Sequence, residues 1–161
     1  MRYDLRRLLD AAAGAVPEAE WVGLRRRRTT ATYLMARDGA FDQAASVTDD
    51  GVMVEVLVNG QFSYAATPDM SPEGVSAAAV RALGWARAVA GRGVFSFDTS
   101  VRPATVTRYS TPRIRRSAMA ADGVYDFLLG ACSALHVSDD IIQTSSMVET
   151  GRYDYEIVST N

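Results

Sequence analysis

Two largely apolar runs lie on either side of Asn59-Gly60, within residues 51–67. Asn-Gly readily adopts the two positive φ angles of a type I′ turn, so the pattern predicts a β-hairpin with its turn at this dipeptide. A two-residue turn sets the register and places Glu55 opposite Tyr64. One predicted face carries Val52, Val54, Val56 and Val58. The opposite face carries larger apolar side chains around Glu55, those of Met53, Leu57, Phe62 and Tyr64. Because both faces are apolar, we expect the hairpin in the middle of a covered sheet.

Shorter patterns precede the hairpin. Leucines and alanines recur at helical spacing over residues 4–14, which predicts a short helix. Apolar residues lead into the Arg25 to Arg28 run, and residues 29–37 are rich in β-branched and aromatic side chains, so we expect two strands with a turn near Arg28. Asp38-Gly39 and Asp50-Gly51 are favourable turn dipeptides, and a third strand is expected between them. With the hairpin, these elements predict an antiparallel meander of five strands.

Two long helices are predicted after the hairpin. Ser71-Pro72-Glu73 provides an N-cap, a proline at the first helical position and an acid in the first turn. The alanine-rich stripe that follows allows this helix to approach the valine face closely, until glycines 91 and 93 end it. Residues 94–116 contain two prolines and five arginines and predict an extended connector. Ser117 is expected to cap the second helix, which ends at His136.

Two final strands are predicted at about residues 140–149 and 152–159, meeting at Thr150-Gly151. A helix-strand-strand unit therefore occurs twice, over residues 4–37 and again over 117–159. The second copy lacks the three strands that continue the first, so it is expected to leave an open sheet edge. The whole pattern indicates an α+β fold: an antiparallel β-sheet covered by long helices, with the helix-strand-strand unit repeated near the C-terminus.

The 161 residues are enough to bury a sizeable core. We divide them into three parts. Residues 1–93 form the helix, the five-stranded meander and the long covering helix. Residues 94–116 form the extended connector. Residues 117–161 form a helix and a two-stranded hairpin that complete the same domain.

Composition narrows the functional classes. The formal net charge is −2, and the side chains of the Arg25 to Arg28 run alternate between strand faces, so no nucleic-acid partner is expected. No apolar run reaches the ~20 residues of a membrane helix, so no membrane partner is expected either. The single cysteine excludes an internal disulfide and fits a reducing compartment. We therefore expect a cytoplasmic protein.

Side chains that commonly carry chemistry are isolated in this sequence. His136 is the only histidine, whereas a zinc-binding helix signature needs two imidazoles one turn apart. Cys132 lies on the apolar stripe of its helix and is expected to be a buried structural residue. Asp49-Asp50 and Asp139-Asp140 adjoin expected turns or strand starts, which favours solvated turn residues over a catalytic acid pair. We predict no catalytic residue, cofactor site or metal ligand in this chain.

Several segments then occur in a characteristic order: Arg37-Asp38-Gly39, residues 50–67, Met70-Ser71-Pro72-Glu73, Tyr109-Ser110-Thr111-Pro112 and Val158-Ser159-Thr160-Asn161. This order resembles the N-terminal half of the TldD/PmbA family, zinc metallopeptidases also described as modulators of DNA gyrase. Family members have an Asp-Gly turn, a Gly-Val-x-Val-Arg-Val strand, an x-Gly turn and an aromatic-Gly-aromatic-Ala strand at the hairpin. Two positions depart from this pattern, because Glu55 stands where the family usually has Arg and Ser63 where it usually has Gly.

The resemblance implies a domain that helps to form a dimer and admits unfolded peptide to an enclosed peptidase. The family's His-Glu-x-x-x-His helix and Cys ligand belong to its C-terminal half, so zinc is expected only in a C-terminal domain or in a partner. The implied partner is a TldD/PmbA-like catalytic chain or an identical subunit. Besides this non-catalytic role, three alternatives stay open. They are an interaction module that pairs through a strand edge, an accessory subunit in peptide natural-product biosynthesis, and a piece of a longer peptidase.

Six residues are candidates for binding a partner or a peptide. They lie on the hairpin, beside the Asp-Gly turn and on the last strand, where the open edge is expected: Glu55, Phe62 and Tyr64, then Arg37, then Tyr153 and Tyr155.

Overall fold

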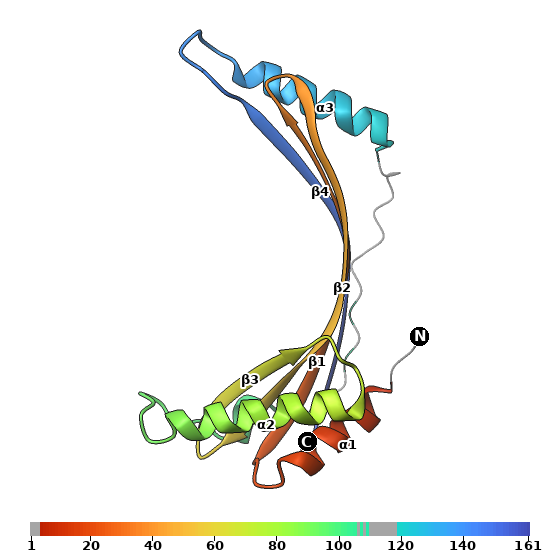
Figure 1. The fold of residues 1–161 in the computed structure, drawn as a ribbon. Coiled ribbons are helices and arrows are strands. Elements are labelled where there is room, and N and C mark those ends of the chain that lie inside the picture. Colours follow the sequence, from red (N-terminus) through yellow and green to blue (C-terminus); the bar gives the residue numbers. More distant parts are fainter. Residues whose placement is uncertain (1–3, 106, 108, 110–118) are drawn as a thin grey trace. The chain divides into compact units, whose positions relative to one another are not determined.

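The computed structural model describes residues 4–105, 107, 109 and 119–161. The elements of these residues are three helices, one short 3-10 turn and four strands, and Figure 1 shows their arrangement as a ribbon. The elements follow one another as α1 (Leu5–Ala15), β1 (Trp21–Arg37), β2 (Ala40–Val58), β3 (Gln61–Thr67), α2 (Pro72–Val89), η1 (Thr99–Val101), α3 (Ala121–Leu135) and β4 (Ser145–Ser159). The described residues therefore confirm the predicted α+β class, with a four-stranded antiparallel sheet.

The hairpin register is confirmed residue by residue: Glu55 lies opposite Tyr64 and Val58 opposite Gln61. Asn59 and Gly60 have φ angles of 50° and 73°, as a type I′ turn requires. The expected place of the hairpin in the sheet was wrong. The strand order is β3-β2-β1-β4, so β3 is an edge strand. After Thr67 the chain turns into α2, and the last strand pairs at the opposite edge, beside β1.

The number of strands was also predicted wrongly, because turn dipeptides were assigned where the chain stays extended. β1 runs through Arg28 without a turn, β2 through Asp50-Gly51 and β4 through Thr150-Gly151. Among the described residues, positive φ angles occur at Asp38-Gly39 and Asn59-Gly60 but not at Gly51 or Gly151. Glycine at position 51 instead allows β2 and β3 to lie close together, since a Cβ there would lie 3.1 Å from the Thr67 carbonyl oxygen. Each predicted helix-strand-strand unit is therefore one helix followed by one long strand.

The helices begin and end for local reasons. The Asp4 side chain caps α1, and the Ser71 side chain caps α2 by accepting a hydrogen bond from the Gly74 N–H at 3.0 Å. The prediction for α3 was wrong at its start. The helix begins at Ala121 after Ala120, which makes no side-chain cap, and Ser117 lies outside the described residues. His136 follows the last helical residue, as predicted.

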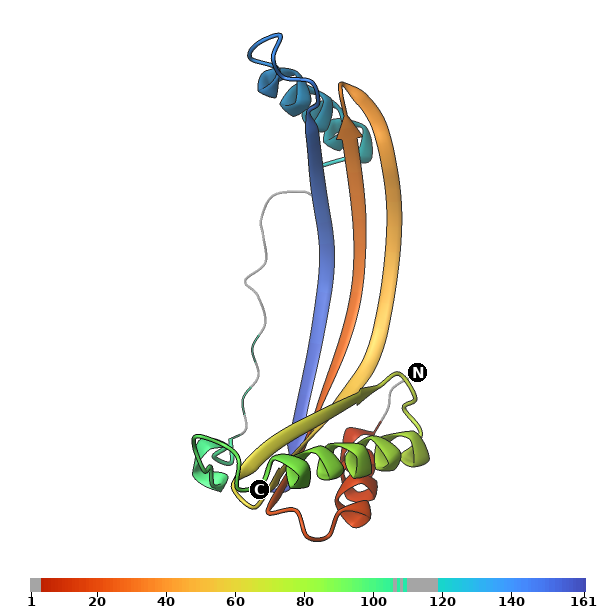
Figure 2. The ribbon, with the colours of Figure 1, turned by 60° about the vertical axis from the view of Figure 1, so that its left-hand side comes forward.

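The chain divides into two compact units, and β1, β2 and β4 contribute residues to both. Unit 1 comprises Met1–Arg28, Asp49–Thr107 and Asp154–Asn161. Figures 1 and 2 show α1 and α2 on one side of its strands. There the predicted valine face and the alanine-rich stripe of α2 belong to one buried core, in which α2 lies against β3 and α1. The core includes Val52, Val54, Val56 and Val58 with Val75, Ala78, Ala79, Ala82 and Ala86.

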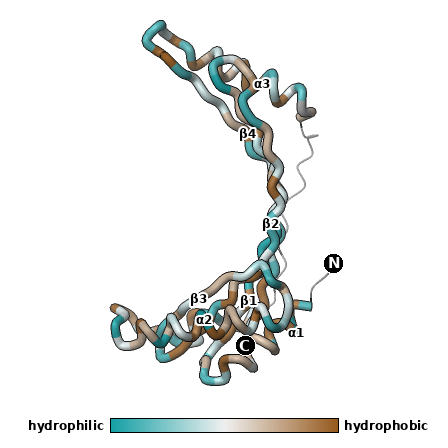
Figure 3. The backbone as a smooth tube through the Cα atoms, viewed as in Figure 1, coloured by the Kyte–Doolittle hydropathy of each residue, from teal (hydrophilic) through white to brown (hydrophobic). Residues whose placement is uncertain are grey.

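Unit 2 comprises Thr29–Thr48 and Arg108–Tyr153. Its core is small, because α3 packs there with few large side chains: Ala36, Val124, Leu128 and Cys132 are buried, with Leu34, Leu129 and Val148 beside them. The rings of Phe41 and Tyr125 meet edge to face, with centroids 5.1 Å apart. Hydrophobic and hydrophilic positions interleave along the elements of each unit, as expected for helices and strands with one buried side (Figure 3).

Candidate functional site

The two faces of the unit 1 sheet differ. α1 and α2 bury the valine face, whereas the opposite face keeps large side chains in contact with solvent. Tyr64 of β3 is 61% exposed, and Tyr155 and Ile157 of β4 are 58% and 68% exposed. Side chains of alternate strand residues share a face, so Tyr155 and Ile157 belong together. We call this surface the open face; it is the main candidate surface for binding.

One end of the open face is occupied by residues 95–102. The Arg102 guanidinium donates to the Glu55 carboxylate with Nη2 and Oε1 2.9 Å apart, and it lies 4.8 Å from the centre of the Phe62 ring. The Phe62 ring also contacts Phe97, at 5.7 Å between centroids, and Trp21, at 5.9 Å. Glu55 therefore helps to hold residues 95–102 against the sheet. We call Arg102, Glu55, Phe62, Phe97 and Trp21 the Arg102 cluster.

Backbone and amide hydrogen bonds hold the same segment in place. Phe97 donates its N–H to the Gly60 carbonyl at 2.9 Å, and the Gln61 amide donates to the Phe95 carbonyl at 2.8 Å. The Asn161 amide donates to the Arg102 carbonyl at 2.5 Å, and its oxygen accepts from the Trp21 indole at 2.7 Å. Residues 95–102 are thus tied to the hairpin and to the end of β4.

A groove of about 520 Å³ occupies another part of unit 1. All four strands or the loops next to them line it, through Arg25, Arg27, Asp49, Asp50, Gly51, Val52, Met53, Ala66, Thr67, Pro68 and Tyr155. An Arg25 guanidinium nitrogen lies 3.5 Å from the Met53 sulfur. Met53, Ala66, Pro68 and Tyr155 supply apolar surface, while Arg25 and Arg27 supply positive charge. Asp49 and Asp50 also line it, so the groove offers apolar surface beside charged groups of both signs, and an extended, partly apolar chain can bind there.

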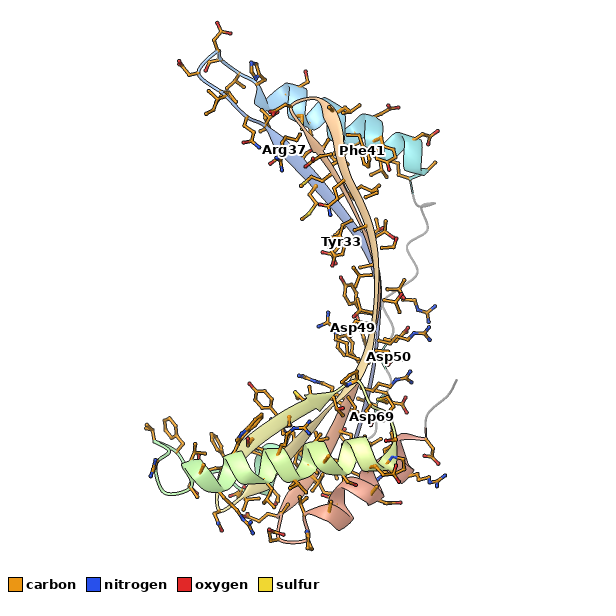
Figure 4. All side chains as sticks on the ribbon, viewed as in Figure 1. Tyr33, Arg37, Phe41, Asp49, Asp50 and Asp69 are labelled. Carbon is orange, nitrogen blue, oxygen red and sulfur yellow. The ribbon has the colours of Figure 1, made fainter. Side chains whose placement is uncertain are left out.

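Asp50 has a different role from its neighbour Asp49. Its carboxylate accepts two hydrogen bonds from Arg26, with donor–acceptor distances of 2.9 and 2.7 Å. Consecutive strand residues point to opposite faces, and Figure 4 shows Asp49 and Asp50 on opposite sides of β2. The hydrogen bonds from Arg26 hold the pKa of Asp50 below its ordinary value of 3.8. The expectation of two solvated turn acids is therefore wrong for Asp50, because the chain continues as a strand and Arg26 lies beside it.

We expect Asp50→Asn to lower the free energy of unfolding at neutral pH by about 1 kcal/mol, because it removes a partly buried charge-assisted pair. A carboxyl group whose folded-state pKa is depressed stabilises the fold above its ordinary pKa. That contribution disappears as the pH falls through the folded-state pKa. The difference from the parent protein should therefore be full at pH 7 and shrink below pH 3.8. Urea unfolding across pH measures it; Asp49→Asn is the control, and an equal, pH-independent loss in both variants would contradict the prediction.

The six predicted candidates fall in both units. Glu55, Phe62, Tyr64 and Tyr155 belong to unit 1, where the first two join the Arg102 cluster, Tyr155 lines the groove and Tyr64 lies on the open face. Arg37 and Tyr153 belong to unit 2. There Arg37 pairs with Asp42 at 3.2 Å and the Tyr153 hydroxyl donates to Glu149. Arg25, Arg27 and Arg102 were not among the candidates predicted from the sequence. Strand alternation in the Arg25 to Arg28 run was the signal available for the first two.

Unit 2 has a second hollow, of about 390 Å³, lined by Asp38, Gly39, Cys132, Ser133, His136, Ile142 and Thr144. Cys132 is 1% exposed, which confirms that it is buried. Its Sγ lies 3.3 Å from the Ser146 hydroxyl, and that contact lowers the pKa of the thiol. Ser146 also donates to the Leu128 carbonyl at 2.9 Å. Cys132 and Ser146 thus join α3 to β4.

The part of the chain that the structure describes contains no group of three or more His, Cys, Asp or Glu side chains able to hold a metal ion. Nor do its helices include one that is both long and apolar enough to cross a membrane.

Comparisons with known proteins place the fold. Residues 22–86 match a family model described as PmbA/TldA metallopeptidase domain 1. A comparison with curated proteins found no match. Among solved structures, a proposed modulator of a DNA gyrase from Thermotoga maritima is similar, with a TM-score of 0.61 and 15% identity. TldE from Thermococcus kodakarensis has a TM-score of 0.57 at 10% identity, and a proposed DNA gyrase modulator from Bacteroides thetaiotaomicron 0.54 at 14%.

The alignments cover 98%, 96% and 96% of this chain, but only 35%, 35% and 36% of the three solved chains. The chain thus spans about a third of the length of the structures it matches. At these identities the likeness concerns the fold. The family match includes β2, β3 and most of α2, the segments whose residues resembled the TldD/PmbA pattern. Residues 22–86 of this chain thus match the first domain of the PmbA/TldA metallopeptidases, and the solved structures with the same fold are a TldE and two proposed DNA gyrase modulators.

Proposed function

We propose that the chain is a non-catalytic part of a TldD/PmbA-like metallopeptidase assembly, in which it receives unfolded peptide and contributes to subunit association. The observation that supports this role is the open face of unit 1 with its strand-lined groove. Exposed aromatic residues and a methionine lie there on regular backbone, a surface that suits extended chains of varied sequence.

In this proposal the zinc site belongs to a C-terminal domain or to a separate chain, and the partner is a TldD/PmbA-like catalytic chain or an identical subunit. The extent of the structural alignments supports this part of the proposal, because the chain aligns over nearly all of its own length with only about a third of each solved structure. The remaining length of an assembly of that size would have to supply the zinc and the catalytic groups. The contribution of this chain is then to bind and orient peptide.

Peptide binding tests the first part of the proposal. An unstructured fluorescein-labelled peptide should bind the full chain and raise its fluorescence anisotropy. Tyr155→Ser should weaken binding about tenfold, because it removes the one aromatic ring that lines the groove. Tyr109→Ser is the matched control, since Tyr109 is an exposed tyrosine that does not line the groove. Equal affinities of the two variants would contradict the assignment of the site.

Metal analysis and a peptidase assay test the non-catalytic role. The isolated chain is expected to hydrolyse no peptide and to carry no stoichiometric zinc. Addition of a chain with the family's His-Glu-x-x-x-His helix should produce a stable complex in size-exclusion chromatography. Hydrolysis by the isolated chain with one bound zinc would overturn the proposal.

A second candidate function is an interaction module that pairs with another strand. β4 lies at the edge of the sheet and carries four large exposed hydrophobic side chains, those of Met147, Tyr153, Tyr155 and Ile157. Sedimentation analysis separates this candidate from the first. A homo-oligomer that persists unchanged when the zinc-binding chain is added favours the interaction module, whereas exchange into a mixed complex favours the peptidase assembly.

A further inference from the structure

We propose that Glu55, Phe62 and Trp21 form a binding site for an arginine side chain of a peptide, and that Arg102 occupies this site until such a peptide displaces it. The inference rests on the proposed peptide-binding function. It names a side chain that the peptide would carry and a segment of the chain that competes with it. All four residues belong to unit 1.

The site combines a carboxylate with two aromatic rings, which together suit a guanidinium group. The Arg102 guanidinium donates to Glu55 with Nη2 and Oε1 2.9 Å apart. It lies 4.8 Å from the centre of the Phe62 ring and 6.0 Å from that of Trp21. A guanidinium group is planar and weakly hydrated, so it can lie over a ring while it donates to a carboxylate. We therefore expect the site to prefer arginine over lysine.

The sheet holds the groups of the site in place without Arg102. Glu55 and Leu57 are alternate residues of β2, and Leu57 pairs with Phe62 of β3, so the three side chains share one face. Leu57 is 0% exposed and Trp21 is 5% exposed. The Trp21 indole also donates to the Asn161 side chain at 2.7 Å. Because paired strands and buried side chains position these groups, the site keeps its form when Arg102 leaves.

Residues 95–102, by contrast, bury little of themselves. Every residue from 91 to 105 is exposed, and the regular structure among residues 95–102 is the 3-10 turn Thr99–Val101. Phe97, which contacts Phe62, is still 42% exposed, and Phe95 is 71% exposed. A segment with so little buried surface separates from the sheet more readily than a strand does. Arg102 is therefore a replaceable occupant of a preformed site.

The site and the groove of unit 1 lie on the same face. Met53 and Ala66, which line the groove, face each other across β2 and β3, and the next pair on that face is Glu55 and Tyr64. Successive pairs on one face are about 7 Å apart, which is the spacing of alternate residues in an extended peptide. A peptide bound in the groove can thus reach Glu55 with an arginine about two residues further along. While Arg102 occupies the site, that part of the face is closed to the peptide.

Fluorescence anisotropy with labelled peptides tests the inference on the full chain. The first peptide has the sequence of residues 94–103, and two others have Gln or Lys in place of its arginine. Arg102→Gln should bind the arginine peptide about tenfold more tightly than the parent chain does, because the internal competitor is gone. The lysine peptide should gain less, and the glutamine peptide should bind the parent and the variant equally.

Three further variants locate the gain in affinity. Arg92→Gln, the same change at an exposed arginine outside the Arg102 cluster, should bind all three peptides as the parent does. Glu55→Gln combined with Arg102→Gln should lose the gain, because the carboxylate partner is absent. Glu156→Gln combined with Arg102→Gln should keep it, since Glu156 is an exposed acid of unit 1 outside the cluster. Circular dichroism checks that each variant is folded.

The outcomes separate this inference from the proposed function. If Arg102→Gln binds the arginine and glutamine peptides with equal affinity, the arginine site is overturned, while peptide binding at the groove stands on the Tyr155→Ser result. If neither these peptides nor the unstructured peptide binds, the proposed function falls and the inference with it. A dimer of the parent chain that is lost in Arg102→Gln would make residues 95–102 of a second copy the occupant and overturn the choice of a separate peptide.

Discussion

Replacement of Ala82 by leucine is expected to lower the free energy of unfolding by about 2 kcal/mol, through overpacking. Ala82 is 0% exposed and belongs to the α2 stripe that packs against the valine face. Close-packed interiors accept added methylene groups only when neighbouring side chains or backbone move. Ala78, Ala79 and Ala86 are also fully buried, so the helix would have to separate from the sheet along several contacts.

Chemical unfolding in urea measures this change, and the same helix offers a matched control. Ala88 is exposed, so Ala88→Leu adds the same atoms without filling the core and should change the free energy of unfolding by less than about 0.5 kcal/mol. Similar losses in both variants would show that the cost comes from the helix itself. A stable, unchanged Ala82→Leu protein would contradict the close packing of α2 in this core.

Glu55→Arg should release residues 95–102 and lower the free energy of unfolding by about 2 kcal/mol, the order expected for losing a hydrogen bond between charged groups. The Glu55 side chain is 20% exposed and accepts from Arg102 at 2.9 Å. The new arginine would repel Arg102 and disturb its position over the Phe62 ring. Hydrogen exchange at the Phe97 N–H, which donates to the Gly60 carbonyl, should become faster before the rest of the sheet opens.

A charge swap distinguishes the ion pair from a simple change of residue size. Glu55→Arg combined with Arg102→Glu should restore part of the lost stability, because opposite charges face each other again. Recovery should be incomplete, since glutamate cannot replace the guanidinium over the Phe62 ring. Glu156→Arg is the control, because Glu156 is an exposed strand residue of the same unit. A double variant no more stable than Glu55→Arg alone would contradict the role of this pair.

The Arg102 cluster also changes the significance of the departure from the family pattern. Glu55 stands where the sequence resemblance leads one to expect arginine, and in this chain it pairs with an arginine from residues 95–102. Local sequence around Glu55 contains no sign of this contact, because the two residues are 47 positions apart. The site on the open face was thus only partly foreseen: Tyr155 was identified, and its neighbours Arg25 and Arg27 were not.

The sequence by itself determined the features that depend on neighbouring residues. Asn59-Gly60 specifies both the turn and the β2–β3 register, since few dipeptides accept two positive φ angles. Ser71-Pro72-Glu73 specifies the start of α2, and the valine and alanine patterns specify which surfaces pack together. These outcomes depend on backbone preferences and periodicity, which local sequence contains.

Only the tertiary structure determined which turn-like dipeptides stay extended and which residues contact each other across the sheet. Asp50-Gly51 and Thr150-Gly151 have the composition of turns, yet both stay extended within long strands. At Gly51 the partner strand passes so close that a side chain would crowd the Thr67 carbonyl. The conformational preference of a dipeptide does not depend on contacts with distant residues. A continuous ladder of interstrand hydrogen bonds therefore outweighs the turn preference of one dipeptide. The same long-range contacts bring together the groove and the Arg102 cluster, on which the proposed binding function depends.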